Sequence, residues 1–284
     1  MKKVIVIAGK GMAGHMVARY LTETGFETLS LHRGKSVGPG EAFFDATEPQ
    51  TLIPIAGQFR ADFIINCAGI LVKASETKPA AAHAVNTEFP HQLEKIFSDS
   101  SARIIHLSTD CVFSGKNGNY SENSPKDGHT AYAISKAEGE LDNKKDITIR
   151  TSIIGPELRS DGTGLLHWFL TQKEPVKGFS KVFWTGITTL ELAKKMPELF
   201  ESDLSGIIHL VPKQKISKYD LLNLINRIWG RQTPLMKDES YQSDKSLVSA
   251  RADVKIVPQN YEDMLTDLKR WMDSHKELYG QYYR

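Results

Sequence analysis

A glycine-rich loop directly behind the first apolar run restricts the fold more than any other feature. The segment VIVIAGKGMAGHM sets three glycines in the order Gly-x-Gly-x-x-Gly between a β-branched run and a helical pattern. Glycine at these positions permits a tight turn, a close backbone approach to a pyrophosphate and packing of helix on strand. Six loop residues are therefore expected to bind a dinucleotide: Gly9, Lys10, Gly11, Met12, Ala13 and Gly14. The alternative is a glycine-rich turn without a ligand.

The first half of the chain alternates short apolar runs with helical patterns. Strands are predicted at 2–9, 26–32, 41–45, 62–69, 102–109 and 146–154, and helices at 12–24, 78–99 and 130–144. Continuously apolar strands joined by helices indicate a parallel sheet that is covered on both faces. The predicted fold class is therefore α/β, with a Rossmann-type doubly wound parallel sheet.

After residue 154 the regular alternation of apolar runs and helical patterns ends. Helices are predicted near 165–172, 188–200, 217–229 and 260–278, with a seventh strand at 206–211. We expect a dinucleotide-binding domain over 1–154, to which 181–211 returns. A smaller, mostly C-terminal substrate-binding lobe would comprise 155–180 and 212–284.

Composition excludes several classes of protein. No apolar run approaches the roughly 20 residues that span a membrane, and the net charge of +2 gives no reason to expect nucleic acid. The start, MKKVIVIAG, is too short an apolar run for a secretory signal, so a cytoplasmic location is expected. Cys67 and Cys111 are predicted to be reduced thiols, and the nine histidines show no metal-ligand spacing.

The end of the second strand bears on the choice of dinucleotide. An NAD site usually has a carboxylate there, whereas this chain has His32, Arg33 and Lys35. A guanidinium can bind a 2′-phosphate through two hydrogen bonds, so NADPH is expected, with NADH as the weaker alternative. A solvated basic turn remains the other interpretation. Asp45 either accepts from the adenine amino group or caps the following helix.

Two further strand ends carry polar residues. The fourth strand ends in NCAGI, which brings Cys67, Ala68 and Gly69 near the cofactor, and the fifth ends in LSTDCVFSG with Thr109. Ligands in such sheets bind beyond the carboxyl ends of the strands. These segments therefore mark the expected site.

The helix in TAYAISKAEGE places Tyr132 and Lys136 on one face, four residues apart. Thr109 and Tyr132 would then reach one carbonyl oxygen, with Lys136 behind the phenol and near the nicotinamide ribose. Tyr241 and Lys245 have the same interval in a polar stretch that is predicted to be ordinary surface.

The motifs GKGMAG, NCAG, LSTDCVFSG, YAISK and IRTSIIGPE together resemble the extended short-chain dehydrogenase/reductase superfamily. Within it they most resemble the dTDP-4-dehydrorhamnose reductase branch of nucleotide-sugar reductases. The resemblance implies a catalytic set of Thr109, Tyr132 and Lys136, with Asn86 either near the proton relay or bonded to backbone. Nucleotide-sugar 4,6-dehydratases carry Asp-Glu after the threonine, whereas Cys111 follows Asp110 here, which favours reduction over elimination.

Other residues are candidates for the substrate side. Asp110 and Trp184 are expected to line the sugar pocket, and Arg251 resembles a nucleotide-diphosphate contact. Arg150 and Ser152 are expected either to contact the substrate or to have structural roles. Trp168 is predicted to lie in the core.

The sequence thus predicts an NADPH-dependent reductase of a nucleotide-activated 4-keto-6-deoxy sugar, for deoxysugar or cell-surface polysaccharide synthesis. Lys136 is expected to bring the pKa of Tyr132 toward working pH. The alternatives are a nucleotide-sugar epimerase and a non-catalytic NADP-binding regulatory subunit. The expected partner is a nucleotide-diphosphate sugar, and a homodimer is left open.

Overall fold

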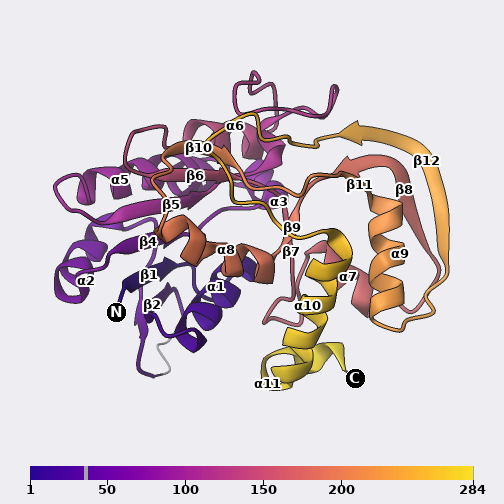
Figure 1. Ribbon diagram of the computed structural model, residues 1–284, viewed down its shortest axis with the longest axis horizontal. Coiled ribbons are helices and arrows are strands. Elements are labelled where there is room, and N and C mark those ends of the chain that lie inside the picture. Colours follow the sequence, from indigo (N-terminus) through magenta and orange to yellow (C-terminus); the bar gives the residue numbers. More distant parts are fainter. Residues whose placement is uncertain (35–37, 284) are drawn as a thin grey trace.

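The computed structural model describes residues 1–34 and 38–283, and a seven-stranded parallel sheet forms its centre (Figure 1). The strands lie in the order β10-β6-β5-β4-β1-β2-β3. Their bounds are β1 (Lys3–Ile7), β2 (Glu27–His32), β3 (Glu41–Phe43), β4 (Phe63–Asn66), β5 (Arg103–Leu107), β6 (Ile147–Arg150) and β10 (Gly206–His209). Because all neighbours pair in parallel, the carboxyl ends of the strands share one edge. The predicted α/β fold class is confirmed.

Helices cover both faces of this sheet, and the alternation of side chains along β1 shows why. Val4 and Val6 enter one apolar core, whereas Ile5 and Ile7 enter a second core on the opposite face. The first core lies under α1 (Met12–Glu23) and α8 (Thr189–Phe200), which also pack against each other. Bulky apolar residues on alternate sides thus require a helical layer on each face.

The second face is covered mainly by the chain between β3 and β5. Its elements are η1 (Pro49–Thr51), α2 (Leu52–Phe59), α3 (Val72–Thr77), α4 (Pro79–Ala82), the π-helical turn η2 (His83–Glu88) and α5 (Phe89–Ile96). The predicted helix over 78–99 is therefore an α-helix interrupted by one π-helical turn. α6 (Ala131–Glu138) packs against this turn and against α3.

A smaller lobe projects beside the main sheet (Figure 1). It contains a three-stranded sheet in the order β11-β8-β12, with α9 packed against β8. The elements of this half are β7 (Ile153–Ile154), α7 (Leu165–Thr171), β8 (Val176–Trp184), β9 (Ile187–Thr188), β11 (Ile216–Ser217), α9 (Lys218–Ile228), β12 (Leu235–Asp244), α10 (Tyr261–Ser274) and α11 (Lys276–Tyr279). α10 contacts both α8 and α9 and so joins the lobe to the main body.

The sequence predicted the helices of this half but missed β8 and β12. β12 is largely exposed, and its register against β8 shifts between Asp238 and Gln242, so it lacks a regular apolar alternation. β8 crosses the expected boundary at residue 180, whereas α8 and β10 lie with the main sheet. The division into two functional lobes stays a proposal.

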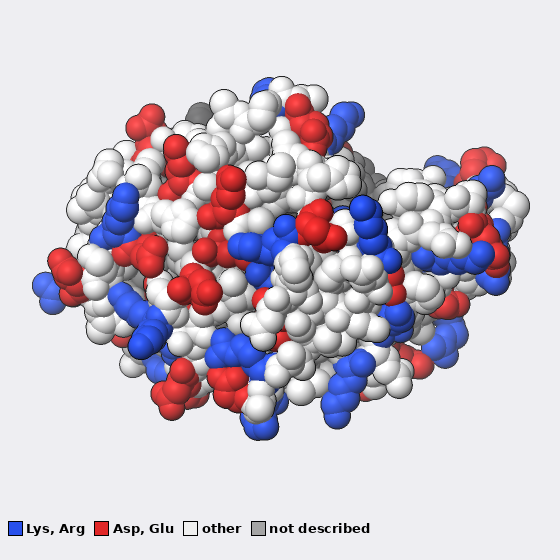
Figure 2. Space-filling view, turned by 90° about the horizontal axis from the view of Figure 1, so that it is seen from above, with Lys and Arg blue, Asp and Glu red and all other residues white. Residues whose placement is uncertain are grey.

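The surface carries charges of both signs. Figure 2 shows Lys and Arg interspersed with Asp and Glu over the viewed face, and the smaller lobe projects beside the main body. That mixture agrees with the net charge of +2. Across residues 1–34 and 38–283, each helix is too short or too polar to traverse a bilayer.

Candidate active site

The glycine loop forms a cradle at the carboxyl end of β1. A Cβ atom at Gly9 would lie 2.0 Å from Ser30 Oγ, and one at Gly14 would lie 2.1 Å from Ala8 O. Both distances are far too short for any side chain, so only glycine fits between β1, β2 and α1. Gly11 caps α1 without a side-chain hydrogen bond, which leaves the first turn open to an outside acceptor. The loop therefore fits a bound phosphate group.

The end of β2 carries the predicted basic residues and a carboxylate that the sequence did not indicate. The buried His32 ring accepts a hydrogen bond from a backbone N–H through Nδ1, while its Nε2 lies 3.2 Å from Glu41 Oε2. Lys10 Nζ lies 3.6 Å from the same carboxylate. Arg33 is exposed, and Lys35 falls outside the described residues. Glu41, from β3, thus balances part of the positive charge at this corner.

Asp45, at the end of the neighbouring turn, has local partners. Its Oδ1 accepts from Thr47 N at 3.0 Å and from Thr47 Oγ1 at 2.9 Å. Such bonds stabilise the turn that leads into the next helix. The N-cap of that helix is Glu48, so Asp45 stabilises the preceding turn and does not cap the helix, and its contact with adenine remains a proposal.

The segment after β4 lies at the same edge as the glycine loop, because Asn66 pairs with Ile7 in the sheet register. Asn66 Oδ1 accepts from Ala68 N at 3.0 Å, which tightens the turn. Burial raises the pKa of the Cys67 thiol to about 12, so the thiol is neutral. The predicted cofactor-binding residues Cys67, Ala68 and Gly69 therefore adjoin the cradle.

Thr109 and Tyr132 meet beyond the end of β5. Thr109 caps the short helix η3 (Asp110–Val112), since its Oγ1 accepts from Cys111 N at 3.1 Å and donates to Asp110 Oδ1 at 3.2 Å. Tyr132 comes from α6, and its phenol lies near enough to Thr109 for the threonine hydroxyl to act on its pKa. Burial raises the pKa of Tyr132 well above its ordinary value; Cys111 and Asp110 add to this rise, and Thr109 opposes it. The phenol therefore carries its proton.

Lys136 lies one helical turn after Tyr132, with its side chain directed at β5. The ammonium Nζ donates to Leu107 O at 2.6 Å. Burial lowers the pKa of Lys136 to about 8, while Glu140 and Cys67 act in the opposite direction. Lys136 does not lower the pKa of Tyr132 in this structure, and the expectation that it brings the phenol toward working pH is wrong.

A buried histidine that the sequence reasoning missed connects Lys136 to β4. Because Asn66 Oδ1 already accepts from a backbone N–H, its amide nitrogen faces His106 Nδ1, at 3.1 Å, and donates to it. Burial and the charge of Lys136 lower the pKa of His106 well below its ordinary value. The neutral ring therefore carries its hydrogen on Nε2, which lies 3.4 Å from Lys136 Nζ. Its only sequence signal was a polar residue inside an apolar strand.

Several other candidates have structural roles. Asn86 accepts from Ile70 N at 2.8 Å and donates to Ile70 O at 3.0 Å, which is the backbone-bonding alternative. The buried Arg150 donates to both carboxylate oxygens of Glu140, at 2.7 and 2.8 Å. Trp168 is 38% exposed, so its prediction as core is wrong: α7 turns other residues inward.

Two lysines of the smaller lobe face Asp110 and Cys111. Lys218, at the start of α9, has its Nζ 4.6 Å from the centre of the Trp184 ring and is attracted to the carboxylate of Asp110. Burial raises the pKa of the Cys111 thiol to about 11, and the charge of Lys245 opposes the rise. The expectation that Lys245 is ordinary surface is therefore wrong. Trp184 is 3% exposed, so Lys218 presents the polar surface there.

Arg251 lies at the opposite edge of the main sheet. Its Nη1 donates to Ser205 O at 2.6 Å and to Ile207 O at 3.0 Å, and the guanidinium also pairs with Asp253. Gly206, between these two acceptors, is the first residue of β10, whereas ligands are expected at the carboxyl ends. Arg251 is therefore held in a structural role, and the structure does not bring it together with Thr109.

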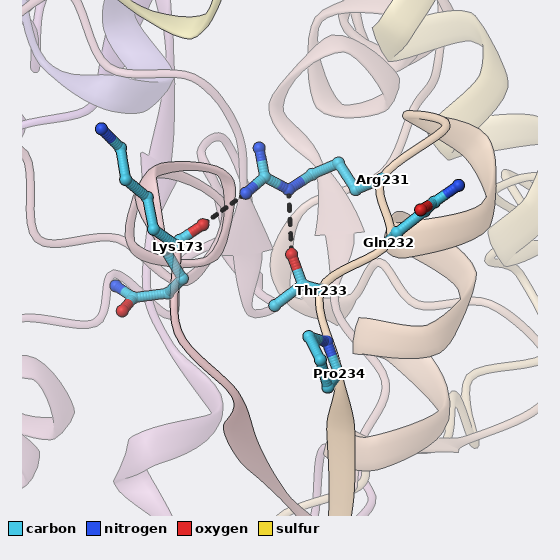
Figure 3. A pocket seen from close by; sticks show the side chains of 6 residues that line it. Lys173, Arg231, Gln232, Thr233 and Pro234 are labelled. Atoms are coloured by element: carbon cyan, nitrogen blue, oxygen red, sulfur yellow. Dashed lines mark hydrogen bonds between the residues drawn. The ribbon is translucent and has the colours of Figure 1, made fainter.

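A shallow surface hollow lies at the junction of α7, α9 and β12 (Figure 3). Its lining residues are Gln172, Lys173, Arg231, Gln232, Thr233 and Pro234. Arg231 donates to Gln172 O and to Thr233 Oγ1, so its guanidinium joins two segments of the lobe (Figure 3). The hollow contains none of the predicted site residues. Within the described part of the chain, no group of three His, Cys, Asp or Glu side chains could hold a metal ion.

Comparisons with known proteins identify the relatives of this chain. The family model described as the RmlD substrate binding domain matches residues 1–277. The "Probable low-salt glycan biosynthesis reductase Agl14" of Haloferax volcanii is 26% identical, over 87% of this chain and 86% of that protein. A dTDP-4-dehydrorhamnose reductase of Streptomyces griseus is 31% identical, over 48% of this chain and 43% of that protein.

Solved structures show the same fold. The crystal structure of a dTDP-4-dehydrorhamnose reductase from Bacillus anthracis in complex with NADP superposes with a TM-score of 0.80. The match covers 95% of this chain and 99% of that chain at 17% sequence identity. At 17% identity this likeness establishes the fold alone, namely a parallel sheet with a smaller lobe beside it.

Proposed function

Because this chain belongs to the RmlD substrate binding domain family, whose members are NAD(P)-dependent reductases of the extended short-chain dehydrogenase type, we propose that it reduces a nucleotide-activated 4-keto-6-deoxy sugar with NADPH. One observation carries the proposal: Thr109 directly follows β5, Lys136 of α6 donates to Leu107 O at the end of β5, and the glycine loop follows β1, two strands away at the same carboxyl edge of the parallel sheet. The glycan-related name of the Haloferax relative supports a role in deoxysugar or polysaccharide synthesis.

The protonation state of Tyr132 suits a proton donor. A phenol with a raised pKa keeps its proton until negative charge develops on an adjacent oxygen, and it then gives the proton to that oxygen. Thr109, whose hydroxyl acts on the pKa of Tyr132, would hold the same carbonyl oxygen. In this proposal Tyr132 and Thr109 act on the oxygen of the keto group, and Lys136 orients the phenol and the cofactor ribose.

The cofactor proposal depends on the chain's own donor groups. The cradle of Gly9 and Gly14 and the uncapped start of α1 fit a pyrophosphate. When bound there, NADPH would supply the hydride for the keto carbon. Arg33 is exposed at the end of β2 and Lys10 lies near it in the loop, and both would favour a 2′-phosphate over a bare ribose hydroxyl.

A cofactor-consumption assay tests this function. The protein is incubated with NADPH and with dTDP-, UDP- and GDP-linked 4-keto-6-deoxy sugars, and NADPH loss is compared with product formed. Equal amounts of oxidised cofactor and reduced sugar support the reductase. Sugar conversion without net cofactor loss indicates the epimerase, and neither change with any sugar indicates a non-catalytic subunit.

A further inference from the structure

Two ammonium groups enter the active-site edge from the smaller lobe. Lys218 is the first residue of α9, and Lys245 follows the last residue of β12. Both act electrostatically on Asp110 and Cys111, the two residues directly after Thr109. The lysines therefore lie on the substrate-lobe side of the position proposed for the keto group.

The backbone fixes the place of Lys245. Asp244 N donates to Gly115 O at 2.7 Å, and Tyr120 N donates to Ser246 O at 2.9 Å. These bonds, on either side of Lys245, attach the end of β12 to the loop that follows η3. The Lys245 stem also packs beside Gly115, where a Cβ atom would lie 2.9 Å from its Cγ. Because the segment is anchored on both sides, the backbone sets the direction in which the Lys245 side chain leaves it.

Lys218 is held by packing rather than by an ion pair. Its Nζ stands 4.6 Å from the centre of the Trp184 ring, at the distance of a cation–π contact. Burial lowers the pKa of Lys218 to about 8, and attraction to Asp110 acts in the opposite direction. Trp184 is 3% exposed, and its Nε1 has no hydrogen-bond partner among the described residues. The indole thus supports the ammonium through its ring face.

The local charges do not balance. Among the described residues, neither Lys218 nor Lys245 has a carboxylate within salt-bridge distance. By contrast, Lys181 and Lys237 on the exposed strands of the same small sheet both pair with Glu239. The Cys111 thiol is neutral, so two cations share the single carboxylate of Asp110. Two partly buried ammonium groups that act on one carboxylate lack a matching number of anions, which is unfavourable unless a ligand completes the set.

We propose that Lys218 and Lys245 form a subsite for an anionic oxygen group of the substrate, a phosphate or a carboxylate, next to the keto group held by Thr109 and Tyr132. The proposal rests on the proposed function for the position of the keto group. Phosphate and carboxylate share the chemistry that two ammonium groups recognise, namely oxygen acceptors with negative charge. The phosphate would come from the nucleotide diphosphate, and the carboxylate from an acidic sugar.

Binding measurements on the whole chain, which need no turnover, test the subsite. Calorimetry compares dTDP, UDP and GDP with their nucleosides in one arm, and UDP-glucuronic acid with UDP-glucose in the other. Lys218→Met and Lys245→Met remove one charge each and keep an apolar stem. Lys237→Met, on exposed β12, is the matched control, and Lys218→Arg restores charge over Trp184.

We expect each Met variant to lower the affinity for the anionic probe by about tenfold or more, the scale of one charge-assisted contact. The Arg variant should recover most of the lost affinity. The loss in the first arm identifies a phosphate, and the loss in the second identifies a carboxylate. Probe affinities equal to wild type in both Met variants overturn the subsite, as does the absence of binding of any probe to the wild type. NADPH turnover is recorded separately, so a failed reductase assay with lysine-dependent probe binding rejects the function and keeps the subsite.

Discussion

Replacing His106 by glutamine is expected to move the alkaline limit of activity to higher pH. His106 presents Nε2–H to Lys136 Nζ at 3.4 Å, because Asn66 occupies Nδ1. The positive end of the ring N–H dipole repels the charged form of Lys136 and so favours its neutral amine. Glutamine reaches a similar position and can turn its carbonyl oxygen toward Lys136, which favours the charged form. The substitution therefore raises the pKa of Lys136.

The structure sets the scale of the shift. Burial places the pKa of Lys136 at about 8, against an ordinary 10.5. A hydrogen bond to a charged group is worth about 1.5–3 kcal/mol, which corresponds to about 1–2 pKa units. If the reaction needs the ammonium, activity falls as pH rises through this pKa. The limit should therefore move from about 8 to about 9 or above.

The assay is kcat/KM for NADPH oxidation from neutral to alkaline pH. Other charged or titratable groups near the pair are Glu140, Cys67 and His91, and they are unchanged in the variant. Tyr132 does not set this limit, because its pKa is raised well above its ordinary value. His91→Gln, on the partly exposed side of α5, serves as control and should leave the limit in place. An alkaline limit in His106→Gln that coincides with wild type would refute the tautomer assignment.

Three further outcomes are expected from the same geometry. Gly14→Ala should cost about 1–3 kcal/mol of stability and weaken NADPH binding, because its Cβ atom would meet Ala8 O. Gly57→Ala on α2 is the control, because open space surrounds its Cβ atom, and it should change neither property. Equal NADPH affinities of Gly14→Ala and wild type in a fluorescence titration would contradict this. Glu140→Gln leaves the buried Arg150 without its counter-ion and should lower the unfolding free energy by about 3–5 kcal/mol in urea titrations. The folded-state pKa of Glu140 is lowered, so its contribution is complete above the ordinary pKa and is lost as pH falls; a variant as stable as wild type at neutral pH would contradict this. Arg33→Ala should reduce the preference for NADPH over NADH in kcat/KM by about tenfold to a hundredfold, and equal use of both cofactors by the wild type would return Arg33 to a solvated turn.

The parallel sheet and the glycine cradle were predictable because their signals are local. Alternating Val and Ile in β1 serve two cores, and Gly9 and Gly14 stand where a Cβ atom would collide with the neighbouring backbone or side chain. Tyr132 and Lys136 share a helix face through their spacing alone. These features need no knowledge of distant contacts.

The features that the sequence did not reveal depend on long-range packing. Lys245 faces Cys111 only because β12 is tied to the loop around Gly115, more than a hundred residues earlier. The Glu41 carboxylate lies beside the His32 ring because β3 pairs with β2, and no residue near the end of β2 in the sequence indicates this contact. β12 itself is mostly exposed and polar, so its strand character comes from pairing with β8.

In the proposed function Tyr132 gives the proton in an NADPH-dependent ketone reduction, and a comparison of wild type with Tyr132→Phe is the sharpest test of this role. The rate of NADPH oxidation with the nucleotide 4-keto sugar that the wild type uses is measured for wild type and for Tyr132→Phe, with NADPH affinity determined in parallel. We expect a loss of about a hundredfold or more in kcat with cofactor affinity nearly unchanged, since the phenol acts in the transition state. A Tyr132→Phe protein that retains more than about a tenth of the wild-type kcat would contradict it.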